Sequence, residues 1–127
     1  FTYTNAKITN AKDETTIDNT PRRTPQFMYS FNPNVNNNKF SAGFYLVGVT
    51  KSYSQDNNKL VMNGYTVVNP YLSYRLTSNI NLSLNGNNVF DALGITEAEE
   101  GSIPANNIVR ARPIQGRSIS MSIKLDL

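Results

Sequence analysis

The sequence lacks cysteine and histidine entirely, and it also lacks tryptophan. Without cysteine, neither a disulfide framework nor thiolate chemistry is available. Without histidine, the chain has neither the commonest metal ligand nor the commonest general base. We therefore expect no metal site, no cofactor and no enzymatic activity.

Charge is also sparse, since charged residues make up 17% of the chain and the formal net charge is +3. The basic residues are scattered singly or in pairs, without the basic stripe typical of nucleic-acid binding, so no nucleic-acid partner is expected. No apolar run approaches the roughly 18 residues of a membrane helix. That absence is neutral toward a transmembrane β-barrel, whose strands are individually inconspicuous.

Neutral polar residues and aromatic rings are abundant instead, with 19 Asn, seven Tyr and six Phe in 127 residues. A disordered chain would have fewer aromatic residues and more charge. This composition suits strands that have one apolar and one polar face and are joined by polar loops.

Alternation with a period of two is the recurring signal, and it is clearest at the C-terminal end. The apolar residues there are Ile119, Met121, Ile123, Leu125 and Leu127, and the polar ones are Ser118, Ser120, Ser122, Lys124 and Asp126. This pattern predicts a strand that separates two different environments.

A hairpin is predicted just upstream of that strand. The apolar members of its two strands are Leu72, Tyr74 and Leu76, then Ile80, Leu82 and Leu84. Pairing Leu76 with Ile80 leaves a three-residue turn, Thr77-Ser78-Asn79, and places both apolar sets on one side of the sheet.

Two further strands are expected around residues 27–31 and 40–46, joined by an Asn-Pro-Asn-rich turn over residues 32–38. The second of them has apolar residues on both faces, including Tyr45 and Val47, so its orientation stays open. Helical periodicity is weak throughout, and the best helical candidate, residues 95–101, spans only one or two turns.

The patterns together predict an all-β chain of about six antiparallel, up-and-down strands. They are expected near residues 1–9, 25–33, 39–50, 65–76, 80–90 and 116–127, with long connections over 10–24, 51–64 and 91–115. Long and short connections alternate, which places the long loops at one end and the tight turns at the other, as in bacterial outer-membrane barrels. The later strands can be drawn at about 10 to 12 residues, near the length that crosses a bilayer. The C-terminus would then be periplasmic.

Six strands are too few to close a barrel, because bacterial single-chain barrels begin at about eight. An open sheet edge in lipid would also leave backbone groups unpaired, and the chain opens at Phe1 without a signal segment. Either most of the barrel lies outside this sequence, or several chains complete one barrel together. We favour the first explanation and expect residues 1–127 to be the C-terminal strands and extracellular loops of a larger transmembrane β-barrel, with no separate domain boundary.

Several motifs resemble, in their order and spacing, the C-terminal end of TonB-dependent receptors. They are Asn63-Gly64-Tyr65-Thr66-Val67-Val68-Asn69 with Tyr71-Leu72-Ser73-Tyr74, Leu82-Ser83-Leu84-Asn85-Gly86-Asn87-Asn88-Val89-Phe90-Asp91, Arg110-Ala111-Arg112-Pro113-Ile114-Gln115-Gly116-Arg117-Ser118-Ile119-Ser120, and Asn19-Thr20-Pro21-Arg22-Arg23-Thr24-Pro25. The resemblance covers residues 19–127, and this part of the sequence is similar to a proteobacterial subgroup of the family that is often linked to carbohydrate uptake. The chain departs from the family by ending in Leu127, where the family usually ends in an aromatic residue.

The resemblance implies a Gram-negative outer-membrane receptor for active nutrient uptake, with an oligosaccharide or a siderophore as its substrate. It also implies a barrel of roughly 22 strands with an N-terminal plug domain. TonB would energise it through a region outside this sequence, and outer-membrane lipid and lipopolysaccharide would be further partners.

Candidates for ligand contact lie in the last long loop. They are the acidic residues Glu97, Glu99 and Glu100 and the basic residues Arg110 and Arg112, followed by Arg117. Carboxylates can serve in acid–base catalysis or bind a hard cation, and guanidinium groups can bind phosphates. The favoured interpretation is that the acidic residues form a solvated loop or short helix and that the arginines pair with them.

Another candidate lies in the loop over residues 51–64, where Tyr53 stands near Asp56 and Asn57. Aromatic residues closer to strand ends fit better as the girdles at the two membrane interfaces. They are Tyr65, Tyr71, Tyr74 and Phe90.

Two other functions stay open. A soluble all-β ligand- or carbohydrate-binding module would also use alternating strands and Asn-rich loops, with residues 119–127 packed on a second sheet. A hydrolase that uses the acidic cluster would lose its activity on Glu97→Gln and Glu100→Gln substitution.

Overall fold

The computed structural model describes residues 1–126, so Leu127, the last apolar residue of the predicted C-terminal strand, lies outside the described residues. The longer strands are β4 (Phe40–Val49), β7 (Tyr65–Arg75), β8 (Ile80–Asn87) and β11 (Ser118–Leu125). The shorter ones are β1 (Thr2–Tyr3), β2 (Phe27–Phe31), β3 (Asn34–Asn36), β5 (Ser52–Tyr53), β6 (Val61–Met62), β9 (Ile95–Ala98) and β10 (Ala111–Pro113). One 3₁₀ turn, η1 (Glu14–Thr16), accompanies them. The chain is all-β, as predicted.

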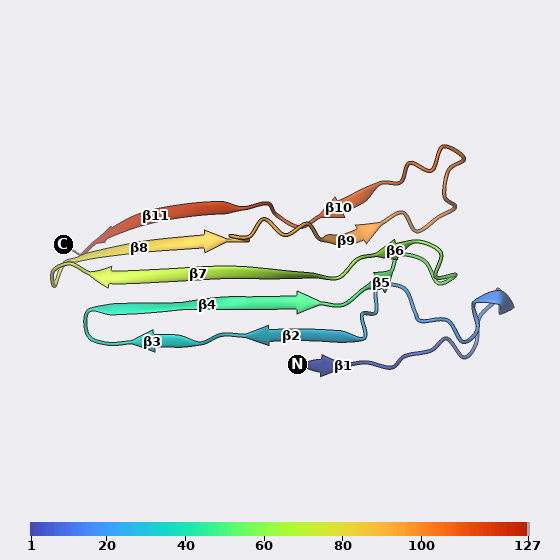
Figure 1. The fold of residues 1–127 in the computed structure, drawn as a ribbon, viewed down its shortest axis with the longest axis horizontal. Helices are drawn as coiled ribbons and strands as arrows, with labels where there is room; N and C mark the ends of the chain where they lie inside the picture. Colours follow the sequence, from blue (N-terminus) through green and yellow to red (C-terminus); the bar gives the residue numbers. More distant parts are fainter. Residues whose placement is uncertain (127) are drawn as a thin grey trace. The chain divides into compact units, whose positions relative to one another are not determined.

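The main sheet contains the strands that the sequence predicted, in the order β1-β2-β4-β7-β8-β11, with β3 also pairing with β4. Within this sheet, each strand lies beside the sheet strand that comes before it and the one that comes after it in the sequence (Figure 1). Strands β7, β8 and β11 pair antiparallel. This order confirms the up-and-down arrangement. Two small two-stranded sheets, β5–β6 and β9–β10, form within connections that were expected to be loops.

The chain divides into two compact units. Unit 1 contains Phe1–Tyr29, Gly48–Tyr65 and Leu93–Ile114, and unit 2 contains Ser30–Val47, Thr66–Ala92 and Gln115–Leu127. Unit 1 therefore holds the long connections, whereas unit 2 holds most residues of the long strands and both tight turns.

In unit 2, the register of β7, β8 and β11 sorts side chains by polarity. Leu72, Leu84 and Met121 lie opposite one another in the three strands and form one apolar row. Two residues further along, Tyr74, Leu82 and Ile123 form a second apolar row on the same face. Rows of Ser73, Ser83 and Ser122 alternate with them on the other face. The predicted pairing of Leu76 with Ile80 is confirmed, because the Leu76 N–H donates to the Ile80 carbonyl at 2.9 Å.

The apolar face of unit 2 is uncovered. Leu84 is 45% exposed and Met121 is 74% exposed. Of the residues that the structure describes, Met62 in unit 1 is the one hydrophobic residue that is buried. A soluble sheet would normally cover such a face with another layer.

The orientation of β4, which the sequence left open, follows from contacts within unit 2. The rings of Tyr45 and Tyr71 lie 5.6 Å apart, and a Cβ atom on Gly43 would lie 2.7 Å from the Tyr71 hydroxyl. The ring of Phe44 instead contacts Phe31, at 6.2 Å. Odd-numbered residues of β4 therefore share the polar face with Tyr71, and even-numbered ones share the apolar face.

The turn predicted over residues 32–38 is too long, because Asn34–Asn36 forms β3 and pairs with β4. The turn itself is tight and is closed by the Asn37 side chain, whose Oδ1 accepts from the N–H groups of Lys39 and Phe40 at 2.8 and 2.9 Å. Local side-chain acceptors of this kind are the reason that Asn is common in turns. Because Asn37 closes the turn so tightly, the residues before it can extend as a strand, and the strand region is longer than the sequence indicated.

Strand length matches the prediction for β4 and β7, which have 10 and 11 residues. The prediction was too long for β8 and β11, which have 8 residues each, and for β1, which has 2. Strand β8 ends at Asn87 because Asn88 adopts a left-handed conformation, with φ at 47°. Pairing of β7 with β8 begins at Tyr71, directly after Pro70, which has no N–H to donate.

In unit 1 the best helical candidate of the sequence, residues 95–101, does not form a helix, because Ile95–Ala98 forms β9 and pairs with β10. The β-branched Ile95 and Thr96 favour a strand. The only helical turn among residues 1–126 is η1, whose N-cap residue Asp13 accepts hydrogen bonds from the Thr15 hydroxyl and N–H, which lower the pKa of its carboxyl group. Within the same residues, no helix is long and apolar enough to cross a membrane.

Candidate ligand-binding site

Charged side chains gather in unit 1 around the β9–β10 hairpin and leave a hollow of about 380 Å³. Its lining residues are Arg23, Glu97, Ala98, Glu99, Glu100, Arg110, Ala111 and Arg112. The antiparallel register places Arg112 opposite Glu97 and Ala111 opposite Ala98. The hairpin therefore presents three acidic and two basic residues from adjacent chain segments, and Arg23 is added from the first long connection.

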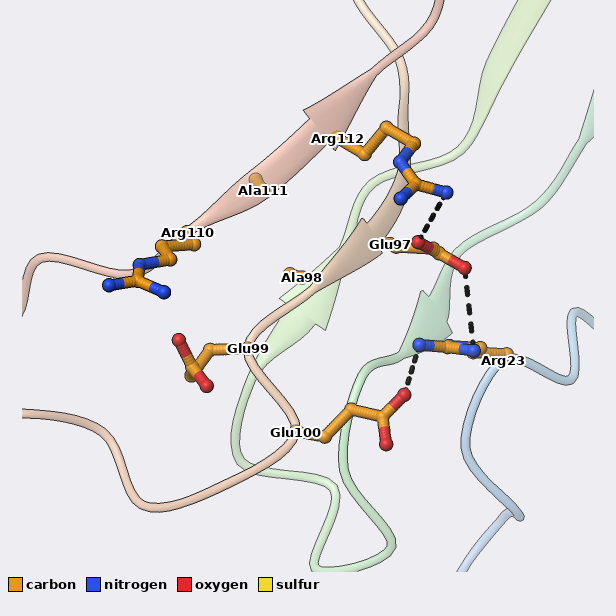
Figure 2. Close-up of a pocket in the computed structure, with 8 residues that line it drawn as sticks. All are labelled: Arg23, Glu97, Ala98, Glu99, Glu100, Arg110, Ala111 and Arg112. Carbon is orange, nitrogen blue, oxygen red and sulfur yellow. Dashed lines mark hydrogen bonds and ion pairs between the residues drawn. The ribbon is translucent and has the colours of Figure 1, made fainter.

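Ion pairs join most of these groups (Figure 2). Arg112 Nη1 lies 2.8 Å from Glu97 Oε2, and Arg23 Nη1 lies 3.5 Å from Glu97 Oε1. Arg23 also pairs with Glu100, whose other oxygen lies 2.8 Å from Arg22 Nη1. Because these side chains are more than one-third exposed, each pair contributes only about 0.2–1 kcal/mol. The pairs serve mainly to fix the positions of the charges.

Glu99 and Arg110 are different. Figure 2 shows the Glu99 carboxylate and the Arg110 guanidinium facing each other across the hollow, and no ion pair or side-chain hydrogen bond joins either group to any residue of 1–126. Their backbones are joined, since the Glu99 N–H donates to the Arg110 carbonyl at 2.9 Å. The hollow therefore contains one acidic and one basic side chain that are unpaired, although their backbones are joined.

The loop over residues 51–64 supports the acidic segment from beneath the surface. Ser54 is fully buried and donates from its hydroxyl to the Glu99 carbonyl at 3.0 Å. Gln55, which is 5% exposed, donates from its side-chain amide to the Gly101 carbonyl. These two bonds fix the backbone on both sides of Glu100, so that three acidic side chains can project from one short segment.

The same loop holds the segment that contains Arg23. The Arg23 N–H donates to the Tyr53 carbonyl at 2.7 Å, and the Arg22 N–H donates to Asp56 Oδ1 at 2.9 Å. Asn58 Nδ2 donates to the Thr20 carbonyl at 2.7 Å. Three segments that are far apart in the sequence are thus joined by named hydrogen bonds.

The predicted site residues fall into two groups. The acidic residues, Arg110 and Arg112 line the hollow, and the expected pairing of arginine with the acidic cluster is seen for Arg112. Tyr53 and Asp56 instead position the Arg22-Arg23 segment, while Asn57 lies on the surface and accepts from the Lys59 N–H at 3.0 Å. Arg117 lies in unit 2, where its N–H donates to Asp91.

Sequence reasoning missed Arg22 and Arg23 of this cluster. It included Ser54, Gln55 and Asn58 in the candidate segment 53–58, but as ligand contacts and not as the groups that hold the backbone. The two consecutive arginines were a visible signal, but their acidic partner Glu100 is 77 and 78 positions away, and Glu97 is about as distant. Among residues 1–126, no group of three or more acidic, cysteine or histidine side chains could hold a metal ion.

Comparisons with known proteins give a likeness of fold. No protein-family model and no curated protein matches the sequence. Among solved structures, the chain is similar to the crystal structure of the ferric yersiniabactin uptake receptor FyuA from Yersinia pestis, with a TM-score of 0.63 and 19% sequence identity. The match covers 81% of this chain and 16% of that chain, so the chain spans about one-sixth of the receptor's length. The chain therefore has the fold of one part of an uptake receptor.

Proposed function

We propose that residues 1–127 are the C-terminal strands and extracellular loops of a larger outer-membrane β-barrel, a TonB-dependent receptor for nutrient uptake, with no separate domain boundary. The uncovered apolar face of β7, β8 and β11 is the observation that carries this proposal. The likeness in fold to an uptake receptor supports it.

An apolar face of this size is unfavourable in water, so another apolar layer must cover it. Exposing a leucine-sized side chain to water costs about 1.5–3 kcal/mol relative to burying it. The face repeats this cost across three neighbouring strands, and the opposite face is polar. A barrel wall between lipid and a wet interior satisfies both faces without a second protein layer.

The orientation proposed for the chain follows from its connections. The tight turns lie in unit 2 and the long connections in unit 1, which corresponds to periplasmic turns and extracellular loops in outer-membrane barrels. The C-terminus would then be periplasmic, TonB would act through a region outside this sequence, and lipid with lipopolysaccharide would surround the wall.

Detergent dependence and resistance to unfolding in sodium dodecyl sulfate test the proposal. We expect the parent protein to remain in the membrane pellet at high salt and to dissolve only with detergent, because lipid covers its apolar face. We also expect unboiled and boiled samples to migrate differently in electrophoresis. A parent that is freely soluble in buffer and migrates identically in both samples would show a soluble binding module instead.

The hollow beside β9 and β10 is proposed to contact the imported nutrient, an oligosaccharide or a siderophore. Its lining carries three acidic and three basic side chains, so it has no net charge that would exclude a neutral polar ligand. Glu99 and Arg110 supply one acceptor group and one donor group whose side chains pair with no residue of 1–126.

Exchanging both of these groups for amides tests that contact. In cells that carry the parent receptor with Glu99→Gln and Arg110→Gln, we expect the half-saturating concentration for uptake to rise about tenfold, because two charged hydrogen bonds become neutral ones. Labelled maltohexaose and ferrioxamine B are suitable probes. Lys12→Gln with Glu14→Gln is the matched control, since it also removes one charge of each sign from exposed positions of unit 1. Equal uptake by the two variants would contradict the assignment.

A further inference from the structure

A row of basic residues crosses the polar face of unit 2. Arg75 of β7 lies opposite Asn81 of β8, which lies opposite Lys124 of β11. The Arg75 N–H donates to the Lys39 carbonyl at 2.7 Å, so Lys39 continues the row on the other side. Residues that lie opposite one another in adjacent strands project from the same face. Lys39, Arg75 and Lys124 therefore project from one face, with Asn81 between Arg75 and Lys124.

Part of this row borders a small hollow of about 90 Å³. The side chains around it include Lys39, Arg75 and Asn81 of the row and Ser41 and Ser73 of the next. A hollow of this size accommodates a single carboxylate group.

Three donor groups around the hollow have no hydrogen-bond partner among residues 1–126. Ser73 donates from its hydroxyl to Asn81 Oδ1 at 3.1 Å, which leaves the Asn81 Nδ2 group as an available donor. Neither Lys39 nor Arg75 forms a side-chain hydrogen bond or ion pair with any residue of 1–126. Lys124 does have a partner, since its Nζ lies 2.9 Å from Asp126 Oδ1.

We propose that Lys39, Arg75 and Asn81 bind the carboxylate of an acidic peptide segment that approaches the polar face of the sheet. Two cations and one amide N–H converge on a carboxylate-sized hollow, and a carboxylate is the acceptor that a guanidinium group binds with two parallel hydrogen bonds. The alternation of faces places the row away from the apolar surface, so an anionic lipid is not the partner. This inference does not depend on the proposed transport function, because the row and the hollow exist whether the opposite face meets lipid or protein.

Binding of hexaglutamate to the full chain in a neutral detergent tests the proposal. We expect saturable binding that weakens about tenfold on Lys39→Gln with Arg75→Gln, whereas hexaglutamine does not bind. The matched control is Lys12→Gln with Lys51→Gln, two exposed residues of unit 1. Both double variants remove two of the positive charges and lower the formal net charge from +3 to +1, so general attraction would weaken both equally.

A charge-conserving variant protects the test against misfolding. Lys39→Arg with Arg75→Lys keeps both charges, and we expect hexaglutamate binding within about threefold of the original. Equal weakening in the Gln variant and its control would overturn the proposal. Loss of binding to phosphatidylglycerol vesicles in the Lys39→Gln, Arg75→Gln variant, with hexaglutamate binding unchanged, would also overturn it and would indicate a lipid ligand.

Discussion

Substituting alanine for Asn88 is expected to lower the free energy of unfolding by about 3–5 kcal/mol. Asn88 is 1% exposed, and its side chain makes three hydrogen bonds in unit 2. Its Nδ2 donates to the carbonyls of Ala92 and Gln115, each at 3.0 Å, and its Oδ1 accepts from the Ala92 N–H at 2.8 Å. Alanine would remove all three of these bonds, each of which contributes about 1 kcal/mol to stability.

The backbone of Asn88 adds a second, separable contribution. Its φ of 47° lies in the left-handed region, which costs alanine about 1–2 kcal/mol and glycine almost nothing. Asn88→Gly should therefore be less destabilising than Asn88→Ala, although both lose the same hydrogen bonds. Urea unfolding of the chain in detergent micelles, followed by circular dichroism, measures both values.

The control for this prediction is Asn85→Ala. Asn85 lies only three positions earlier on the exposed polar face of β8, and we expect its substitution to change the free energy of unfolding by less than about 0.5 kcal/mol. If Asn88→Ala and Asn85→Ala have the same effect, the side-chain bonds to Ala92 and Gln115 do not stabilise the fold as argued.

Asn88 also holds together the two residues between which the segment with the charged hollow is inserted. Ala92 and Gln115 are the residues of unit 2 directly before and after Leu93–Ile114. One side chain therefore joins the two ends of that segment. Asp91 adds a second bond there, since its Oδ1 accepts from the Arg117 N–H at 3.1 Å.

Strand register could be predicted from the sequence because side chains alternate with a period of exactly two, so a shift by one residue would expose the wrong face. Pairing of Leu76 with Ile80 follows from this rule and is confirmed. The rule fails where both faces are apolar, as in β4. There, the contact of Tyr45 with Tyr71 decides the orientation, and no local pattern encodes that contact.

The charged hollow could be predicted only in part, for a related reason. Glu97 and Arg112 lie in one loop, and opposite charges within a loop suggest a pair. Arg23 meets Glu97 and Glu100 because the first and last long connections come together in unit 1, and that proximity depends on the order of strands. The burial of Asn88 was equally hidden, since it is one of 19 asparagines in a sequence that uses them mostly at the surface.

A positive charge on the apolar face should reveal whether lipid covers it, and this is the second large effect expected. For the parent receptor folded in lipid vesicles, we expect Leu84→Arg to lower the free energy of unfolding by about 2–4 kcal/mol, as a charge near the middle of a bilayer does. Leu84 lies within β8, between Leu72 and Met121 of the neighbouring strands. Asn85→Arg, one position further on the polar face, should cost less than about 1 kcal/mol.

The way in which the arginine penalty varies along the strand shows whether lipid or protein covers the apolar face. Leu76 lies on the same apolar face, one residue after the end of β7 and directly before the tight turn, where a bilayer would meet water. If lipid covers the face, Leu76→Arg should cost only about 0–1 kcal/mol, because the penalty for arginine falls toward the membrane interface. If a second protein layer covers it, the two leucines should respond alike, since their exposed fractions in the chain are similar, at 55% for Leu76 and 45% for Leu84. Equal losses of unfolding free energy for Leu84→Arg and Leu76→Arg would therefore favour a soluble sandwich over a membrane wall, because in a bilayer the two positions differ in depth.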